Sequence, residues 1–521
     1  MTRPGGGSDP TAAVAPAAAV APTAPAAAVE EAVAVATGGA DGPLIEELGE
    51  WLASNWDPDL TVGQWWERLG TAGWAAPSLP IDAYGRGMSR TGALRVVQVI
   101  ARFGALGPPS GLGLLLAAPT IVAHGSPEQV ETYVRDIVTG RRAWCQLFSE
   151  PGAGSDLAGL TSRAVGDGDE WIVNGQKVWT SGGQHADLGM LLARTDPDVP
   201  KHQGITYFAL DMHQEGVEVR PLREMTGRSL FNEVFFTDAR VPDAAVIGGV
   251  GRGWAVANTT LGLERAGLGS GGGGNGAGGV ATPGTVAGDL DRRAGAFVAR
   301  DPDRLGRRGP AASGPSAGEA AGDAGEAASG PSAGEAAGDA GEAAGDAGEA
   351  ASDSGERAML RAMRGGTGVM VDLARSRGRS DDPLVRQGLA QLYTWNELGR
   401  MNGLRLKAVR EAGGDVPGMP NIAKLSMSHI MRLSRDLGLQ VLGAAGTLHA
   451  YDDEGRATLA RAGVTPSANA ITELALLAQA PPIYGGTDQI QRNIIGERVL
   501  GLPKEPGNNR NTPFSELAKN G

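Results

Sequence analysis

The spacing of apolar residues changes twice along this 521-residue chain, and these changes limit the folds open to it. Residues 44–52 place their apolar side chains on one helical face, and similar runs continue to residue 138. Residues 141–245 instead contain short runs that alternate apolar and polar residues, as half-buried strands do. Helical spacing returns at residues 253–268 and again beyond residue 359. The pattern predicts an α+β fold in the order helical, β, helical.

The same changes predict the domain boundaries. We expect an all-helical N-terminal domain over residues 43–140, a middle antiparallel β domain over residues 141–245, and a C-terminal four-helix bundle made of residues 246–268 and 359–503. Residues 1–42 are rich in Ala and Pro and lack apolar periodicity, which predicts a disordered tail. Residues 504–521 are expected to form a C-terminal tail.

A low-complexity insert at residues 269–358 interrupts the predicted bundle. It opens with a glycine run and contains a 16-residue repeat, SGPSAGEAAGDAGEAA, at Ser313 and again at Ser329, with a shortened third copy from Gly345. Small and acidic residues bury too little apolar area to offset chain entropy. The composition therefore predicts a flexible linker, with a partner-binding or solubilising segment as the alternative.

The clearest local signal lies at residues 170–180, EWIVNGQKVWT. Two strand-like runs flank Asn174-Gly175, a pair that readily forms a type I′ turn. The sequence therefore predicts a β-hairpin that turns at Asn174-Gly175.

Charge and cysteine content exclude several classes of protein. The net charge is −13, but ten acidic residues and no Lys or Arg lie between Ser313 and Glu356, so the rest is close to neutral. That balance gives no electrostatic case for nucleic-acid binding. The single cysteine, Cys145, rules out a disulfide framework, and the six histidines show no metal-ligand spacing. We expect no metal site, no export signal, no membrane span and a cytoplasmic location.

A turn of small residues marks the entry to the predicted β domain. Residues 151–155, PGAGS, carry little side-chain bulk, so a large flat ligand could approach the backbone. Ser149 and Ser155 supply hydroxyl groups at the two ends of this turn. Trp179, followed by two hydroxyl residues, ends the strand-like run beside it. These features fit a ligand site, and an ordinary surface turn followed by an ordinary hairpin remains an equal alternative.

Four blocks then occur in an order that resembles the acyl-CoA dehydrogenase family. They are SEPGAGSD at residues 149–156, NGQKVW at residues 174–179, MTG at residues 225–227 and YGGTDQIQR at residues 484–492. The resemblance covers nearly all of residues 43–503 outside the insert. It implies FAD held between the β domain and the bundle, an acyl-CoA substrate, and a homo- or hetero-tetramer with related subunits.

The resemblance also implies roles for individual residues. Positions matching flavin or FAD contacts are Gln146, Phe148, Ser149, Trp179, Thr180, Ser181, Gln440, Gly443, Thr487 and Gln489. Positions matching substrate contacts are Ser155, Gly262, Arg265 and Gly486. The family's arginine for the FAD pyrophosphate has three candidates here, Arg375, Arg377 and Arg379, of which we favour Arg379.

One departure from the family concerns the catalytic base. Oxidation of an acyl thioester across Cα–Cβ needs a base for the α-proton, and a dry pocket makes a carboxylate competent for this. The family's loop carries an acid after the tyrosine, where this chain has Gly485. Some members place the base on the helix after the β domain, which here matches Glu264. Asp488 is a lesser candidate.

The resulting prediction is FAD-dependent α,β-dehydrogenation of an acyl-CoA to the trans-2-enoyl-CoA. Glu264 takes the α-proton, flavin N5 takes the β-hydride, and an electron-transfer flavoprotein reoxidises the flavin. Two alternatives remain open: a flavin monooxygenase or oxidase on the same fold, and a non-catalytic subunit of a heteromeric complex.

Overall fold

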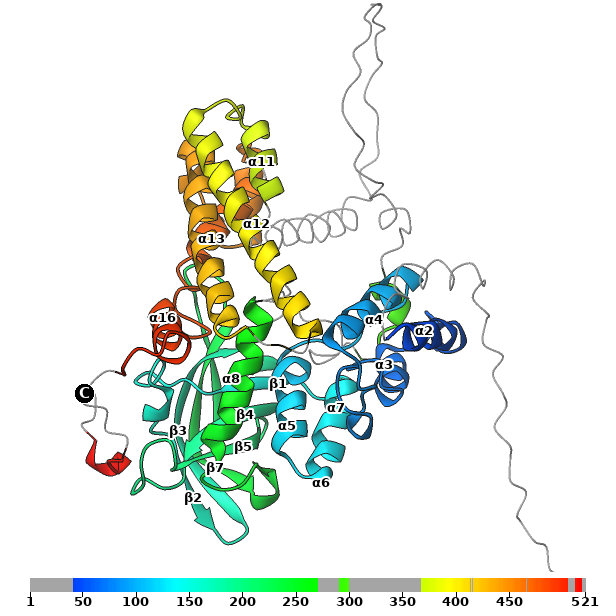
Figure 1. The fold of residues 1–521 in the computed structure, drawn as a ribbon, viewed down its shortest axis with the longest axis vertical. Helices are drawn as coiled ribbons and strands as arrows, with labels where there is room; N and C mark the ends of the chain where they lie inside the picture. Colours follow the sequence, from blue (N-terminus) through cyan, green and yellow to red (C-terminus); the bar gives the residue numbers. More distant parts are fainter. Residues whose placement is uncertain are drawn as a thin grey trace, which may run out of the picture.

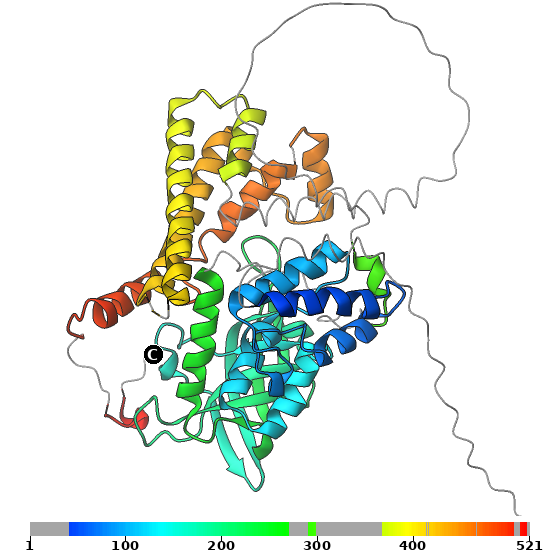
Figure 2. The same cartoon turned by 45° about the vertical axis from the view of Figure 1, so that its right-hand side comes forward.

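The structure is a computed structural model. It describes residues 41–269, 290–298, 367–504 without 413, 415 and 465, and 511–517. A β sheet lies beside a group of short helices, and a bundle of long helices stands at one end of the sheet (Figures 1 and 2). Helix α8 (Gly253–Gly269) lies along the sheet and reaches the base of the bundle. The helical, β, helical order and the α+β class predicted from the sequence are confirmed.

The N-terminal helices begin at local capping signals. Thr61 and Gln64 form a reciprocal capping box at the start of α3, and Ser126 with Gln129 forms another at the start of α6. That second helix reaches Val138 through a π-helical turn. The helices of this domain are α2 (Gly42–Asn55), α3 (Val62–Thr71), α4 (Arg90–Phe103), α5 (Ala118–His124), α6 (Pro127–Gln129) and α7 (Arg135–Val138). Three fully buried tryptophans, Trp65, Trp66 and Trp74, fill its core.

The middle domain is one eight-stranded sheet. Its strands are β1 (Trp144–Leu147), β2 (Arg163–Asp167), β3 (Glu170–Ser181), β4 (Leu188–Arg194), β5 (Ile205–Asp211), β6 (Val217–Leu222), β7 (Phe231–Pro242) and β8 (Val246–Ile247). The order is β6-β7-β3-β2-β4-β5-β8, with β1 paired to β4. Most pairings are antiparallel, as expected, but β1–β4 and β2–β4 are parallel.

The predicted turn at Asn174-Gly175 is wrong, because β3 runs straight through it. The chain turns instead at Gly168-Asp169, where Gly168 has φ +69° and Asp167 pairs with Glu170. A glycine at the first of two turn residues is typical of type II′ hairpins. Asn174-Gly175 lies at a bulge against β7, where the Asn174 amide donates to the Asp238 carboxylate at 2.9 Å.

The C-terminal bundle has an apolar core of its own. Its helices are α11 (Thr367–Ser376), α12 (Pro383–Glu411), α13 (Met419–Leu442), α14 (Asp453–Arg461), α15 (Pro466–Leu477) and α16 (Asp488–Ile494). Helix α13 is central, since it packs against α12, α15, α16 and α8. Leucine, methionine, valine and isoleucine side chains from α11, α12, α13 and α15 form the core. None of the helices within the described ranges combines the length and apolar character that a membrane crossing requires.

Part of the predicted flexible insert is folded onto the N-terminal domain. Residues 290–298 lie beside the start of α3, and the first two N–H groups of that helix donate to Arg292 and Leu290 carbonyls at 2.8 Å. Helix N-termini leave such donors without intrahelical partners. Ala294 is completely buried and donates its own N–H to the Leu60 carbonyl at 2.8 Å. This segment therefore completes the cap of α3. The repeats lie outside the described residues.

Placing a charge at Ala294 should release this segment. Burial of an unpaired carboxylate costs several kcal/mol, so Ala294→Glu should speed trypsin cleavage after Arg292 or Arg293 by about tenfold or more. Mass spectrometry of the fragments measures the rate. Ala296 is exposed, so Ala296→Glu is the matched control and should cleave like the wild type. Equal rates for the two variants would contradict the docking.

The C-terminal tail also contains a docked segment. Within residues 511–517, the Phe514 and Ser515 N–H groups donate to the carbonyls of Val199 and Pro197 at 3.0 and 2.8 Å. The guanidinium of Arg194 lies 3.5 Å from the centre of the Phe514 ring. This segment thus packs on the loop between β4 and β5 (Figure 1).

Candidate active site

Glu264 is held in the fourth turn of α8, a helix packed between β5 and α13. The Gln146 side chain on β1 donates to the Glu264 carboxylate at 3.5 Å. Burial of the carboxyl group raises its pKa, and the Gln146 hydrogen bond and the Arg265 charge only partly oppose this. A carboxyl group in these surroundings holds its proton more tightly than in water. The structure therefore places a sheltered carboxyl group at the position favoured from the sequence.

Tyr484, on the loop between α15 and α16, lies near enough to this carboxyl group to be affected by its charge. Burial, together with the charge of Glu264, raises the pKa of Tyr484 to about 12, so it stays neutral near pH 7. The next two residues, Gly485 and Gly486, have φ +62° and +82°. Side chains other than glycine rarely adopt such angles. The backbone conformation at position 485 thus favours glycine, which agrees with the absence of an acidic residue there.

The loop ends at the cap of α16. The Thr487 hydroxyl accepts from the Ile490 N–H at 3.1 Å, so part of its hydrogen-bonding capacity serves the helix. Gln489 is exposed. Both were predicted as FAD contacts. In this chain they lie on the α16 start that follows the Tyr484 loop. Asp488, the lesser base candidate, is buried, and its carboxylate forms ion pairs with Lys424 at 3.2 Å and Arg432 at 3.3 Å. These pairs give the carboxylate a structural role.

The predicted flavin-lining residues of β1 and β3 lie side by side. The Val178 N–H donates to the Ser149 carbonyl at 2.9 Å, which joins the end of the β1 segment to β3. At Trp179, β3 carries an extra residue relative to β7, and the Trp179 backbone has φ +63°. Trp179 is 62% exposed and meets the Phe231 ring edge-on at 6.0 Å. Strained, exposed aromatic residues of this kind concentrate at ligand sites.

Two buried polar atoms beside Trp179 have no hydrogen-bond partner in the described part of the chain. They are the Thr180 hydroxyl oxygen and the side-chain carbonyl oxygen of Asn232, residues that face each other across β3 and β7. Buried polar groups without partners are rare in native structures. The pair marks a place where a ligand with hydrogen-bonding atoms fits.

Phe148, predicted to contact the flavin, has a side chain that is only 4% exposed and packs edge-on against Tyr207, with the ring centres 5.9 Å apart. The sequence pattern does not distinguish a core aromatic from a ligand-lining one. Only the backbone of Phe148 remains available, and its carbonyl accepts from Lys177 at 3.0 Å.

A buried ion pair supports the turn that carries Ser149 and Ser155. The Lys177 ammonium lies 2.8 Å from the Glu150 carboxylate, and both side chains are almost fully buried. Glu150 also accepts from the backbone of Thr161 and Ser162. This pair ties the start of the turn to β3, and Ser155 remains exposed at the surface.

The predicted FAD residues of the bundle form a second, separate group. Arg379 donates to the Gln440 carbonyl at 3.3 Å and to Asp382 at 2.6 Å. Arg375 instead lies 3.6 Å from Asp372. Arg379 is therefore the one of these two that contacts the predicted segment. The loop between α11 and α12 lies at the end of the bundle that points away from the sheet (Figures 1 and 2). Gly443, at the end of α13, has φ +58°.

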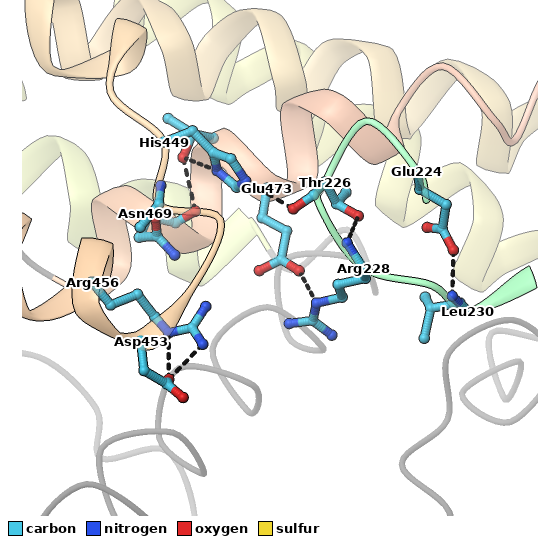
Figure 3. A network of polar contacts seen from close by, with 11 residues as sticks. Glu224, Thr226, Arg228, Leu230, His449, Asp453, Arg456, Asn469 and Glu473 are labelled. Atoms are coloured by element: carbon cyan, nitrogen blue, oxygen red, sulfur yellow. Dashed lines mark hydrogen bonds and ion pairs between the residues drawn. The ribbon is translucent and has the colours of Figure 1, made fainter. Parts of the chain in front are cut away.

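The MTG block at residues 225–227 joins the sheet to the bundle (Figure 3). The His449 ring donates from Nε2 to the Thr226 carbonyl at 3.2 Å. Arg228 forms an ion pair with Glu473 on α15 at 2.6 Å. These contacts anchor the β6–β7 loop on the bundle, so this block is structural in the chain.

The remaining predicted residues lie close to Glu264 on α8. Burial lowers the pKa of Arg265, with Arg498 acting in the same direction and Glu264 opposing. A side chain at Gly262 would meet no atom within 4 Å, so there is open space beside this turn of α8. Arg498 was not predicted, because no motif at its position signals a contact with a helix more than 200 residues earlier. The described residues contain no cluster of His, Cys, Asp or Glu arranged to hold a metal ion.

Three family models match the chain. They are "Acyl-CoA dehydrogenase, N-terminal domain" over residues 44–141, "Acyl-CoA dehydrogenase, middle domain" over residues 145–239 and "Acyl-CoA dehydrogenase, C-terminal domain" over residues 356–500.

Relatives and solved structures agree with these models. Acyl-CoA dehydrogenase IpdE1 of Mycobacterium tuberculosis is 31% identical over 85% of this chain and 88% of its own length. Acyl-CoA dehydrogenase FadE34 of the same organism is 52% identical over 38% of this chain and 28% of its own length. The structure of the Tcur3481-Tcur3483 steroid ACAD shares the fold at 23% identity, with a TM-score of 0.57 over 92% of this chain and 99% of that one.

Proposed function

Because the chain belongs to the acyl-CoA dehydrogenase family, whose members are oxidoreductases acting on CH–CH groups, we propose that Glu264 is its catalytic base. In this proposal the protein oxidises an acyl-CoA thioester across Cα–Cβ to the trans-2-enoyl-CoA. The enzyme class and the family predicted from the sequence are confirmed by the comparisons.

The observation that carries the proposal is the sheltered carboxyl group of Glu264 beside Gln146 and Tyr484. Its raised pKa makes it a stronger base once ionised, which suits removal of a weakly acidic α-proton. Arg265 on the same helix offsets the negative charge of the ionised state.

The family uses FAD, and the residues of this chain fit it. The unpartnered Thr180 and Asn232 oxygens, the exposed Trp179 and the small-residue turn after Glu150 offer hydrogen bonds and a flat surface to a large planar group. Bound FAD supplies the acceptor for the β-hydride. We propose that Gln146, Ser149, Trp179, Thr180 and Ser181 hold its ring.

The second group of predicted residues supports an oligomer. Arg379 and Gln440 contact each other at the end of the bundle distant from the sheet. In a tetramer, these two residues of one subunit would contact the FAD that is bound by a neighbouring subunit. We propose a homo- or hetero-tetramer with related subunits, an electron-transfer flavoprotein as electron acceptor and a cytoplasmic location.

The substrate is proposed to be a branched or otherwise bulky acyl-CoA. With the base on α8 and Gly485 in the loop, the loop side of the site carries no acid side chain, and Gly262 leaves open space on the helix. Anaerobic mixing of the purified flavoprotein with straight, branched and polycyclic acyl-CoAs tests this. We expect flavin reduction and enoyl-CoA product with the bulky substrates.

Hydrogen peroxide or a hydroxylated product in air, without enoyl-CoA, would favour the oxidase or monooxygenase alternative. Reduction that occurs only after a partner subunit is added would favour the non-catalytic role.

Trp179→Gly should separate cofactor binding from stability. Glycine relieves the left-handed backbone, which costs about 1–3 kcal/mol for other residues, so the Tm without added FAD should fall little or rise. FAD should bind about tenfold more weakly, because the stacking surface is lost. Trp171→Gly on the same strand is the control and should lower the Tm with little change in FAD affinity. Unchanged FAD binding by Trp179→Gly would contradict the proposed lining.

A further inference from the structure

Gln491 is a fully buried side chain that contacts the glycine loop twice. Its amide nitrogen donates to the carbonyl oxygens of Gly485 at 2.9 Å and Gly486 at 3.1 Å. The fit is close, since a Cβ added at Gly486 would lie 2.6 Å from that nitrogen. One side chain of α16 therefore fixes two consecutive carbonyls of the loop that precedes its helix.

Gln491 is itself held by α13. The Asn421 amide donates to the Gln491 side-chain oxygen at 2.6 Å. One turn along α13, the buried Lys424 ammonium lies 3.2 Å from Asp488, and Arg432 lies 3.3 Å from the same carboxylate. Both Asn421 and Gln491 are buried, and a buried polar contact stabilises less than it specifies geometry. Apolar side chains would join the two helices as well, but they could not orient the loop carbonyls.

The loop needs such a restraint. Gly485 and Gly486 both have positive φ, and glycine has more backbone freedom than any other residue. Tyr484, whose pKa is raised in part by the Glu264 charge, directly precedes them. A small rotation at the two glycines would move the tyrosine ring away from the carboxyl group.

We propose that Gln491 is a positioning residue: anchored by Asn421, it fixes the Gly485 and Gly486 carbonyls and thereby keeps Tyr484 against Glu264. The inference rests on the proposed role of Glu264 as base. Three titratable groups from different elements interact electrostatically with that carboxyl group or with its neighbour Arg265: Tyr484 from the loop, Arg265 itself from α8, and Arg498 from the turn after α16.

Loss of the restraint admits water to the carboxyl group. Burial is the largest cause of its raised pKa, so hydration lowers that pKa. The base must be ionised to act, so kcat/KM falls below its pKa. A lower pKa therefore moves the acid limb of the pH profile to lower pH.

The test is Gln491→Met, which keeps side-chain length and removes the amide. We expect the acid limb of kcat/KM for acyl-CoA oxidation to move down by about half a pH unit or more, with kcat reduced about tenfold. Arg432→Met is the matched control. It removes one α13–α16 ion pair without touching the loop, and should lower the Tm while the limb stays in place.

A second variant covers the case in which Gln491→Met does not fold. Asn421→Ala leaves both loop hydrogen bonds possible but frees the amide that makes them, so the limb should move in the same direction by a smaller amount. A lowered Tm with an unmoved limb in the folded variants would overturn the inference. Glu264→Gln in the same assay keeps the two proposals distinct, because a native rate in that variant contradicts the base assignment itself.

Discussion

Replacing Glu264 with Gln should slow reduction of the flavin by acyl-CoA by about 10²–10⁴-fold, the range that general acid–base groups contribute. The amide has nearly the same shape as the carboxyl group but cannot take the α-proton. Stopped-flow absorbance under anaerobic conditions measures the rate. Because burial raises the pKa of Glu264, an ionised carboxylate there is destabilising, and the variant should melt at the same temperature as the wild type or higher above neutral pH.

Glu218→Gln is the control for this experiment. Glu218 is exposed on β6 and pairs with Arg220 at 2.8 Å, so its carboxylate has no contact with the site. That variant should reduce the flavin at the native rate. A native rate in Glu264→Gln as well would remove Glu264 from the chemistry and leave the non-catalytic and oxygen-dependent alternatives.

Replacing Lys177 with Met should cause the largest loss of stability. The change leaves the Glu150 carboxylate buried without its cation and the Phe148 carbonyl without its donor. Removal of one partner from a buried ion pair costs about 3–5 kcal/mol. Denaturant unfolding of the single variants and of Lys177→Met/Glu150→Gln measures the coupling. The double variant should be more stable than Lys177→Met. A loss below about 1 kcal/mol in the single variant would contradict the role of the pair.

The same pair predicts a loss of stability in acid. Burial alone would raise the pKa of Glu150, but the Lys177 charge and the hydrogen bonds from Lys177, Thr161 and Ser162 lower it to about 2. A carboxyl group with a depressed pKa in the folded state stabilises the protein above its unfolded pKa. That contribution is lost as the pH falls from the ordinary carboxyl range toward 2.

The sequence predicted the domain order well because local rules decide it. The Ser126 capping box and the apolar periodicity of the helices depend on residues three or four apart, and the structure has both. The Asn174-Gly175 turn failed because a second turn signal, Gly168-Asp169, lay six residues earlier and pairing with β7 favoured it. Turn propensity alone does not choose between two adjacent candidates.

Two docked segments could not be predicted from composition. Residues 290–298 contain Leu290, Phe297 and Val298, but the surrounding glycine and acidic repeats dominate any average over the insert. Phe514 is equally isolated in a polar tail. Their docking depends on the N–H groups at the start of α3 and on the Arg194 guanidinium that the Phe514 ring covers, and both are properties of the folded chain.

The candidate site, too, was only partly predictable from the sequence. The sequence led to Glu264 through the missing acid at Gly485 and a match to family members. It gave no sign that the Glu264 charge would reach Tyr484, more than 200 residues later, or that the Gln491 amide would donate to the Gly485 and Gly486 carbonyls, since no local pattern signals either interaction. The burial of the Phe148 side chain could not be predicted either, because core and ligand-lining aromatic residues share one sequence pattern.

Exchange of the α-proton tests the central claim most directly, because it isolates proton transfer from hydride transfer. A 3-thia-acyl-CoA has no β-hydrogen to lose, so the oxidised flavoprotein in deuterium oxide can only exchange its α-protons. Mass spectrometry of the recovered thioester follows the exchange. If Glu264 is the base, exchange is rapid with the wild-type protein and with Glu218→Gln, and close to the uncatalysed rate with Glu264→Gln. Exchange at the wild-type rate in Glu264→Gln would contradict that assignment.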